Sequence, residues 1–209
     1  MEDGFMDFNF KMKSLKRADL TGSELRFAQA AFESDPSIRF GIDDADKIVA
    51  VYFSSPPTES IAKQLGELRH LYWLGVAPVL IDYDPMVNYK EGCLDILIES
   101  TLHMKLKLFL AARIPLSSEN LDTLSRIKSI EYLRCSSNIY DRHVDFLKKF
   151  RAIKSMTLAE CPRVSCASLI NLLTSASIPE LYLTEGLYSS DDRIRLKRSS
   201  PATKFRFIP

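Results

Sequence analysis

The side chains that most often carry catalysis are sparse in this chain of 209 residues. His70, His103 and His143 are its only histidines, and none stands with a Cys or Ser in a recognised nucleophile–base arrangement. Seven glycines are present, but none has the GxGxxG or GxxxxGK spacing of a phosphate-binding loop. We therefore predict that the protein is not an enzyme and that it requires no cofactor.

Metal ligands are equally few. The chain has four cysteines, Cys93, Cys135, Cys161 and Cys166. Cys161 and Cys166 have four residues between them, and no second pair or nearby His completes a zinc set. Asp82 and Asp84 would lie on one side of a strand, but no third cation ligand is near them in sequence. We expect structural thiols and no metal site.

Composition and charge place the chain among globular proteins. Apolar residues make up 46% and charged residues 26% of the chain, and no apolar run is long enough to cross a bilayer. The first residues lack the basic and apolar regions of a secretion signal, so we expect a cytoplasmic protein without membrane association. Residues 1–100 carry a net charge of −7 and residues 101–209 a net charge of +8. This gradient would favour oriented encounters with a charged partner, although such asymmetry is also common.

One motif occurs three times, at residues 127–135, 153–161 and 178–186. Each copy has apolar residues at offsets 0, 3 and 5 and a small residue at offset 8, and a Leu lies six residues before each. The apolar alternation predicts a half-buried strand. The segments between copies have the apolar spacing of short helices, at 118–124, 141–150 and 165–173.

Weaker copies extend the motif over most of the chain. The expected strand cores begin at residues 48, 71, 106, 130, 156, 181 and 205. Successive cores are 23 to 26 residues apart, except for a step of 35 between 71 and 106. A strand plus a short helix in about 25 residues cannot bury its own apolar face, so such units must stack.

This pattern resembles the leucine-rich repeat in its irregular, cysteine-containing form. The resemblance implies an α/β fold, a short solenoid whose function is binding. The turn position of the three clear copies holds Cys135, Cys161 and Gly186 instead of the Asn of the family. A ladder of Asn side chains is therefore not expected.

The N-terminal part is interpreted as a cap. Residues 1–45 would form this segment, with a helix at 21–33 that buries Leu25, Ala28 and Phe32 and begins with a capping box of Thr21 and Glu24. The repeat domain would span residues 46–209 and contain a helix at 59–68. It would also contain an insertion at about 77–100, with strands at 79–83 and 94–98 and a projecting loop at 82–91. Residues 189–203 are polar and basic and are predicted to be mobile.

The resemblance also implies a binding surface, because residues beside the buried strand positions face outward on the concave sheet. On this mapping the expected partner-binding residues are Tyr72, Leu74, Lys107, Phe109, Glu131, Leu133 and Tyr182. One row of the mapping, Leu74, Phe109, Leu133 and Ala159, is apolar where water is expected. Such a row is either an exposed contact surface or is covered by residues 1–20 or 75–100.

The function expected from these features is non-catalytic protein binding, as in a small cytoplasmic inhibitor, immunity or adaptor protein. The alternative is nucleic-acid binding through Arg193, Arg195, Lys197 and Arg198. Phosphate contacts of these residues would give a steep salt dependence. The segment lacks interleaved aromatic residues for base stacking, which disfavours this alternative. No small-molecule substrate is predicted.

Overall fold

The computed structural model describes residues 20–77 and 93–209. Its strands are β1 (Arg39–Ile42), β2 (Ile48–Phe53), β3 (Trp73–Val76), β4 (Leu108–Ala112), β5 (Tyr132–Ser136), β6 (Ser155–Ala159), β7 (Glu180–Thr184) and β8 (Lys204–Ile208). Its α-helices are α1 (Gly22–Ser34), α2 (Glu59–Leu65), α4 (Cys93–Ser100), α5 (Ser118–Ser125), α6 (Val144–Leu147), α7 (Cys166–Ser175) and α8 (Ser190–Ser199). Two 3-10 helices are η1 (Asp141–His143) and η2 (Glu185–Leu187).

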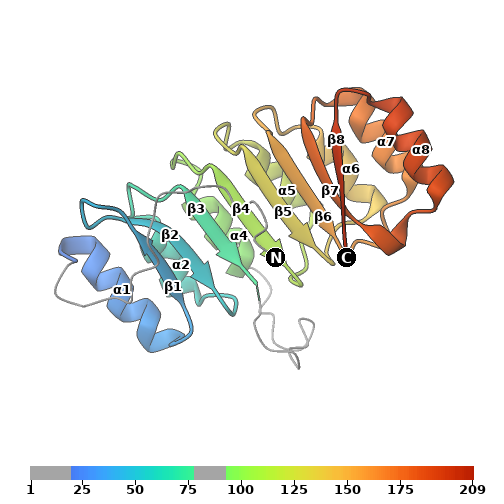
Figure 1. Ribbon diagram of the computed structural model, residues 1–209. Helices are drawn as coiled ribbons and strands as arrows, with labels where there is room; N and C mark the ends of the chain where they lie inside the picture. Colours follow the sequence, from blue (N-terminus) through green and yellow to red (C-terminus); the bar gives the residue numbers. More distant parts are fainter. Residues whose placement is uncertain (1–19, 78–92) are drawn as a thin grey trace.

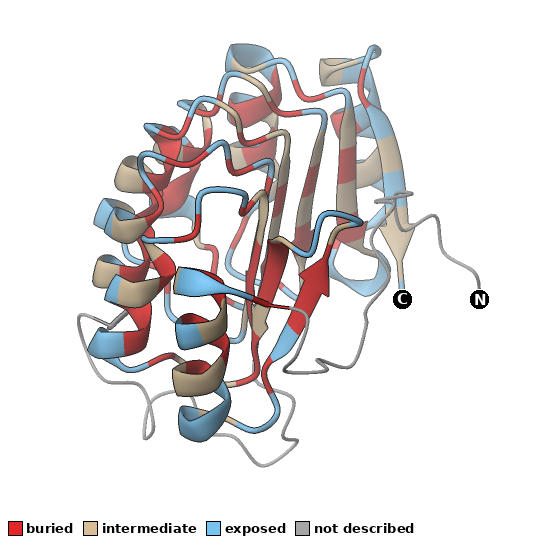
Figure 2. Cartoon of the chain, turned by 90° about the vertical axis from the view of Figure 1, so that its left-hand side faces the viewer, coloured by how far each residue is buried: buried red, intermediate tan, exposed pale blue. Residues whose placement is uncertain are grey.

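The fold is α/β, with one eight-stranded sheet in which strand order in space follows strand order in the chain (Figure 1). β1 and β2 form an antiparallel hairpin, and every later pair of neighbours is parallel. Parallel neighbours need a crossover connection, which the helices supply. From α2 to α8 the helices lie on one face of the sheet, each beside the next (Figures 1 and 2).

Alternation along the strands follows from this layering. β5, β6 and β7 share one burial pattern, in which the second and fourth residues are buried and the other three are half-buried. The buried residues face the helices, because successive side chains of a strand point to opposite sides of a sheet. The opposite side, called the open face below, carries the half-buried residues.

Helix starts are fixed by short polar side chains. Ser117, Ser165 and Ser189 precede α5, α7 and α8, and the side-chain oxygen of each accepts a hydrogen bond from a backbone amide of the first turn. These bonds satisfy amides that have no partner within the helix. The expected helices at 118–124 and 165–173 are confirmed. The segment 189–203, predicted to be mobile, is instead helical over α8, because Ser189 and Asp192 form a capping box there.

The cap segment differs from prediction in detail. α1 buries Phe27, Ala28 and Ala31, whereas Phe32 is 43% exposed. The buried face of α1 is therefore rotated around the helix axis relative to the predicted face. Thr21 precedes α1 but makes no side-chain cap bond, so the expected capping box is absent. The ring of Phe27 packs edge-on against Phe40 of β1, with centroids 5.9 Å apart, which ties α1 to the first strand.

The predicted insertion is corrected in part. Residues 94–98, expected as a strand, lie in α4, where Leu94, Leu97 and Ile98 are buried. A short apolar run fits a buried helix as well as a strand, and periodicity alone does not separate the two. α4 provides the crossover between β3 and β4, as other helices do elsewhere in the sheet. The expected strand at 79–83 and the expected loop at 82–91 fall between β3 and β4 in the sequence and lie outside the described residues.

The strand register differs from the predicted mapping over half of the sheet. The aligned core residues are Val51, Leu74, Phe109, Leu133, Met156, Leu181 and Phe205. The predicted cores at 156, 181 and 205 are correct, whereas those at 48, 71, 106 and 130 begin three residues too early. Ile127, Ile130 and Leu133 are themselves spaced by three, so two frames of the motif overlap in sequence.

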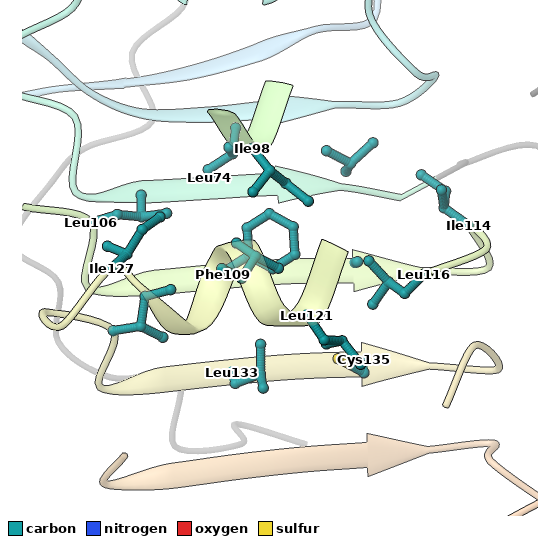
Figure 3. Packing of buried hydrophobic residues seen from close by; sticks show 14 of the residues in the cluster. Leu74, Ile98, Leu106, Phe109, Ile114, Leu116, Leu121, Ile127, Leu133 and Cys135 are labelled. Atoms are coloured by element: carbon teal, nitrogen blue, oxygen red, sulfur yellow. The ribbon is translucent and has the colours of Figure 1, made fainter. Parts of the chain in front are cut away.

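This register places three expected binding residues in the core. Leu74, Phe109 and Leu133 are each 0% exposed and lie between the sheet and the helices (Figure 3). Three members of the apolar row are therefore neither an exposed surface nor a surface covered by another segment, because they are the inward side chains of β3, β4 and β5 (Figure 3). The fourth member, Ala159, is half-buried on the open face of β6.

The corrected register also reveals a buried Asn after β5. Asn138 lies five residues after Leu133, at the position that Cys161 holds after Met156. Its Nδ2 donates to the carbonyl oxygens of Ala111 (3.1 Å) and Ile114 (2.9 Å) in the segment that follows β4. Asn138 thus satisfies two backbone carbonyl groups in the segment that follows the neighbouring strand β4. The expectation from sequence, that no turn position holds an Asn, had missed this residue.

Truncation of Leu133 should lower the free energy of unfolding by about 2–5 kcal/mol, because Leu133→Ala leaves a cavity between β5 and the helices. Leu133→Asp should abolish the folded state, since an unpaired carboxylate would be buried. Urea denaturation measures both. Leu102→Ala, at a side chain that is 37% exposed, is the control. An unchanged midpoint for Leu133→Ala would show that Leu133 is not core.

Asn138→Asp should destabilise the fold at neutral pH more than Asn138→Ala does. The carboxylate cannot donate to Ala111 and Ile114 and would oppose their carbonyl oxygens, at a cost of about 1–3 kcal/mol. The difference should shrink in acid, where the carboxyl group can donate. Chemical denaturation at pH 7 and pH 4 measures it, with exposed Asn171→Asp as the control. Equal midpoints for Asn138→Asp and Asn138→Ala at pH 7 would contradict the role of Asn138.

Candidate functional site

The open face of β5 to β8 is the candidate site, because its side chains are not committed to the core. Its central row follows the register across five strands: Leu110, Arg134, Thr157, Tyr182 and Arg206. A second row beside it holds Tyr132, Ser155, Glu180 and Lys204, and its neighbour on β4, Leu108, is buried. Aromatic and cationic side chains therefore stand on adjacent parallel strands, about 4.8 Å apart along each row.

Electrostatic contacts organise the end of this face. Glu180 forms ion pairs with Lys204 (3.4 Å) and Arg206 (3.3 Å), so one carboxylate is shared by two cations. Burial raises the pKa of Glu180, but the hydrogen bonds of Arg206, Lys204 and Tyr182 outweigh it and hold the pKa below its ordinary value. Glu180 is thus charged at neutral pH, and the local charge of the three ionic groups is positive.

The centre of the face is less exposed to water. Burial lowers the pKa of Arg134, which the nearby Tyr182 opposes, and the guanidinium group stays protonated at neutral pH. Burial also raises the pKa of Tyr182, so its phenol is neutral and can donate or accept a hydrogen bond. A planar cation and an aromatic ring that are already partly desolvated lose less hydration when a partner covers them.

The expected site residues separate into three groups in the structure. Tyr182 lies on the open face, as predicted. Tyr72, Lys107 and Glu131 form a different row just before β3, β4 and β5. The amide of Lys107 donates to the carbonyl oxygen of Tyr72, and the amide of Glu131 donates to that of Lys107. Leu74, Phe109 and Leu133 lie in the core, as described above.

The row of Tyr72, Lys107 and Glu131 continues to Lys154. The amide of Lys154 donates to Glu131, and its ammonium pairs with the same residue at 2.7 Å. Sequence reasoning missed Arg134 and Tyr132 as members of the open face near Tyr182. Alignment of Asn138 with Cys161 is the signal that could have identified them.

The residues proposed for nucleic-acid binding lie on α8 and are partly committed to structure. Arg193 pairs with Glu185 at 3.2 Å, donates to the carbonyl oxygen of Tyr188 at 3.1 Å, and stacks over Phe207 at 4.8 Å. Arg195 pairs with Asp192 at 3.6 Å within the helix. Lys197 and Arg198 are exposed in the last turn, where cations stabilise the helix dipole. The four residues do not form one open cationic surface.

Groups that could do chemistry are buried or scattered in the described part of the chain. Burial raises the pKa of Cys135, Cys161 and Cys166, so these thiols are protonated at neutral pH. Cys135 aligns with Leu158 in the register and does not share a position with Cys161, contrary to prediction. Over residues 20–77 and 93–209, no three His, Cys, Asp or Glu side chains are grouped to hold a metal ion. No described helix is both long and apolar enough to cross a bilayer.

His143 is the one fully buried histidine of the described residues, at 0% exposure in η1. Its Nε2 accepts a hydrogen bond from Nε of Arg142 at 3.2 Å, so the neutral ring carries its proton on Nδ1, which has no partner in the described structure. Tyr140 packs edge-on against the ring at 5.3 Å. Burial, and then the charge of Arg142, lower the pKa of His143.

Comparison with models of known protein families and with curated proteins gives no match.

Acidification should destabilise the fold through His143. Its pKa is lowered on folding, so below about pH 6.5 the unfolded chain binds more protons than the native chain. The free energy of unfolding is therefore higher at higher pH and falls as the pH is lowered, with a slope of at most about 1.4 kcal/mol per pH unit from this one group. Denaturation between pH 7.5 and 5.5 measures the slope.

The variant His143→Phe should flatten this slope, because it removes the titrating ring, whereas exposed His103→Gln should retain it. The comparison is between slopes and so does not depend on how far either variant is destabilised. A slope that is the same in His143→Phe and in the unaltered chain would show that other groups cause the acid sensitivity.

Proposed function

We propose that this protein is a non-catalytic binding module that holds an acidic surface of another protein on its open face. The observation that carries the proposal is the central row, where Arg134, Tyr182 and Arg206 lie in register on the exposed side of a sheet whose other side is filled. Tyr and Arg are the side chains that most often dominate protein interfaces. The positive charge around Glu180 supports an acidic partner.

We further propose that β2 to β8 with their crossovers are stacked units resembling leucine-rich repeats. In the corrected frame, Ile130, Leu133, Cys135 and Asn138 correspond to Ile153, Met156, Leu158 and Cys161. All eight are buried, and the last residue of each set is the Asn or Cys of the family's motif. This correspondence supports the resemblance more strongly than the frame expected from sequence.

A binding role of this kind suits a cytoplasmic inhibitor, immunity or adaptor protein. Those roles require a rigid surface and no reaction. The strands that carry the open face are held by backbone ladders and by a continuous core, so the side chains on them are fixed relative to one another. A preorganised surface loses little conformational entropy on binding.

Tyr182→Ala and Arg206→Ala should each weaken partner binding about tenfold or more, as expected for central interface residues. The intact chain is used to capture protein from a lysate of expressing cells, and the captured protein is purified. Its dissociation constant is then measured for each variant by calorimetry. The binding constant of the unaltered chain should also weaken as salt is raised.

Arg198→Ala is the matched control, because it removes one cation from α8, on the helix side of the sheet. It should bind as the unaltered chain does. Retention of full affinity by both open-face variants, loss with the control alone, or recovery of nucleic acid in place of protein would overturn the proposed function.

A further inference from the structure

A cleft lies at the other end of the sheet, well apart in sequence from the open face of β5 to β8. It has a volume of about 880 Å³, within the range of small-molecule sites, and is lined by Ser23, Gly66, Glu67, Arg69, His70, His103, Met104 and Lys105. A smaller hollow of about 400 Å³ shares Arg69, His70 and Lys105 with it and reaches Leu71, Tyr72 and Lys107. The two together are called the basic cleft below.

Three elements build the basic cleft. Ser23 comes from α1, the residues from 66 to 72 connect α2 to β3, and the residues from 103 to 107 connect α4 to β4. α2 and α4 pack against each other, which brings their following segments side by side. Leu68, Leu71, Met104 and Leu106 are buried between the exposed cationic residues, so each segment is anchored in the core.

The charge in the cleft is positive and poorly compensated. Arg69, Lys105 and Lys107 form no ion pair with any carboxylate of the described chain, whereas most other described cations do. Glu67 is the one acidic residue among the described residues of the lining, and it pairs with Arg26 at 3.8 Å. The nearest acid beside Lys107 in the strand register, Glu131, is held by Lys154 at 2.7 Å.

Cations gathered on a concave wall repel one another and concentrate an electrostatic field, which an anion relieves. An Arg guanidinium can hold two oxygens of a phosphate at once, and Lys adds a point charge. His70 and His103 supply further nitrogen donors on the same wall. The spread of three fixed cations over two joined hollows suits more than one phosphate group.

We propose that the basic cleft binds a small soluble ligand bearing two or more linked phosphate groups. This site is independent of the proposed protein-binding face, because no residue is shared between the two. A small ligand, in place of a polymer, fits the volume of this cleft, which opens to solvent between Ser23 of α1 and the two connecting segments.

The test is isothermal titration calorimetry of the full chain with inorganic tripolyphosphate at fixed ionic strength. Sulfate, which has a single anionic group, is titrated for comparison. Tripolyphosphate should bind with one site and should bind more tightly than sulfate. The double variant Arg69→Gln with Lys105→Gln should weaken binding at least about tenfold, because two charged hydrogen-bond donors are lost. All three lining cations are exposed, so its thermal midpoint should stay close to that of the unaltered chain.

The matched control is Lys197→Gln with Arg198→Gln, which removes the same charge from α8. It should bind tripolyphosphate as the unaltered chain does. Equal weakening by both double variants would show only general charge attraction and would overturn the proposal. Absence of binding by the unaltered chain would overturn it, as would affinity that rises with the length of an RNA oligonucleotide and exceeds that for tripolyphosphate. Failure here leaves the partner capture of the open face unaffected, so the two proposals fail separately.

Discussion

One-sided burial is the constraint on which this structure depends. Each strand from β5 to β7 contributes only two inward side chains, such as Met156 and Leu158, and each helix contributes one narrow stripe, such as Leu169 and Leu172 of α7. Neither element can remove these groups from water alone. Burial is completed only when the next strand and the next helix are in place, so every unit derives its stability from its neighbours.

The same constraint explains where binding surfaces can arise. Side chains that face the helices are fixed by packing, and their replacement is costly. Side chains on the open face, and those in the loops before β3 and β4, do not fill the core and can be chosen for contact with other molecules. The structure therefore separates a row containing Arg134 and Tyr182 from a cleft containing Arg69 and Lys105, and no residue belongs to both.

The sequence predicted the α/β class, the order of most strands, and the register of β6 to β8, where only Ala159 and Thr184 stand three residues after Met156 and Leu181. It misplaced β2 to β5 because a bulky apolar residue also stands three residues after each expected core residue, as Leu133 does after Ile130. Both frames are apolar, and hydrogen bonds between strands decide between them. Those bonds are not encoded in periodicity.

The prediction of the binding residues contained the same error. A shift of three residues changes the parity of a strand, so Leu133 lies in the core instead of on the expected surface, and Arg134 lies on the open face. α4 was missed for a related reason, since four of five residues from Leu94 to Ile98 are apolar and fit either element. The basic cleft joins two segments more than thirty residues apart, and only the packing of α2 on α4 brings them together.

The last described strand, β8, has an outer edge without a neighbour in the described sheet. A sheet that grows by adding parallel strands in chain order has, at that edge, a template onto which another molecule could polymerise. Lys204 and Arg206 stand on this strand and share a single carboxylate, Glu180, so a second copy laid against it would bring like charges together. The two cations of β8 therefore disfavour pairing of this edge with the same edge of a second copy.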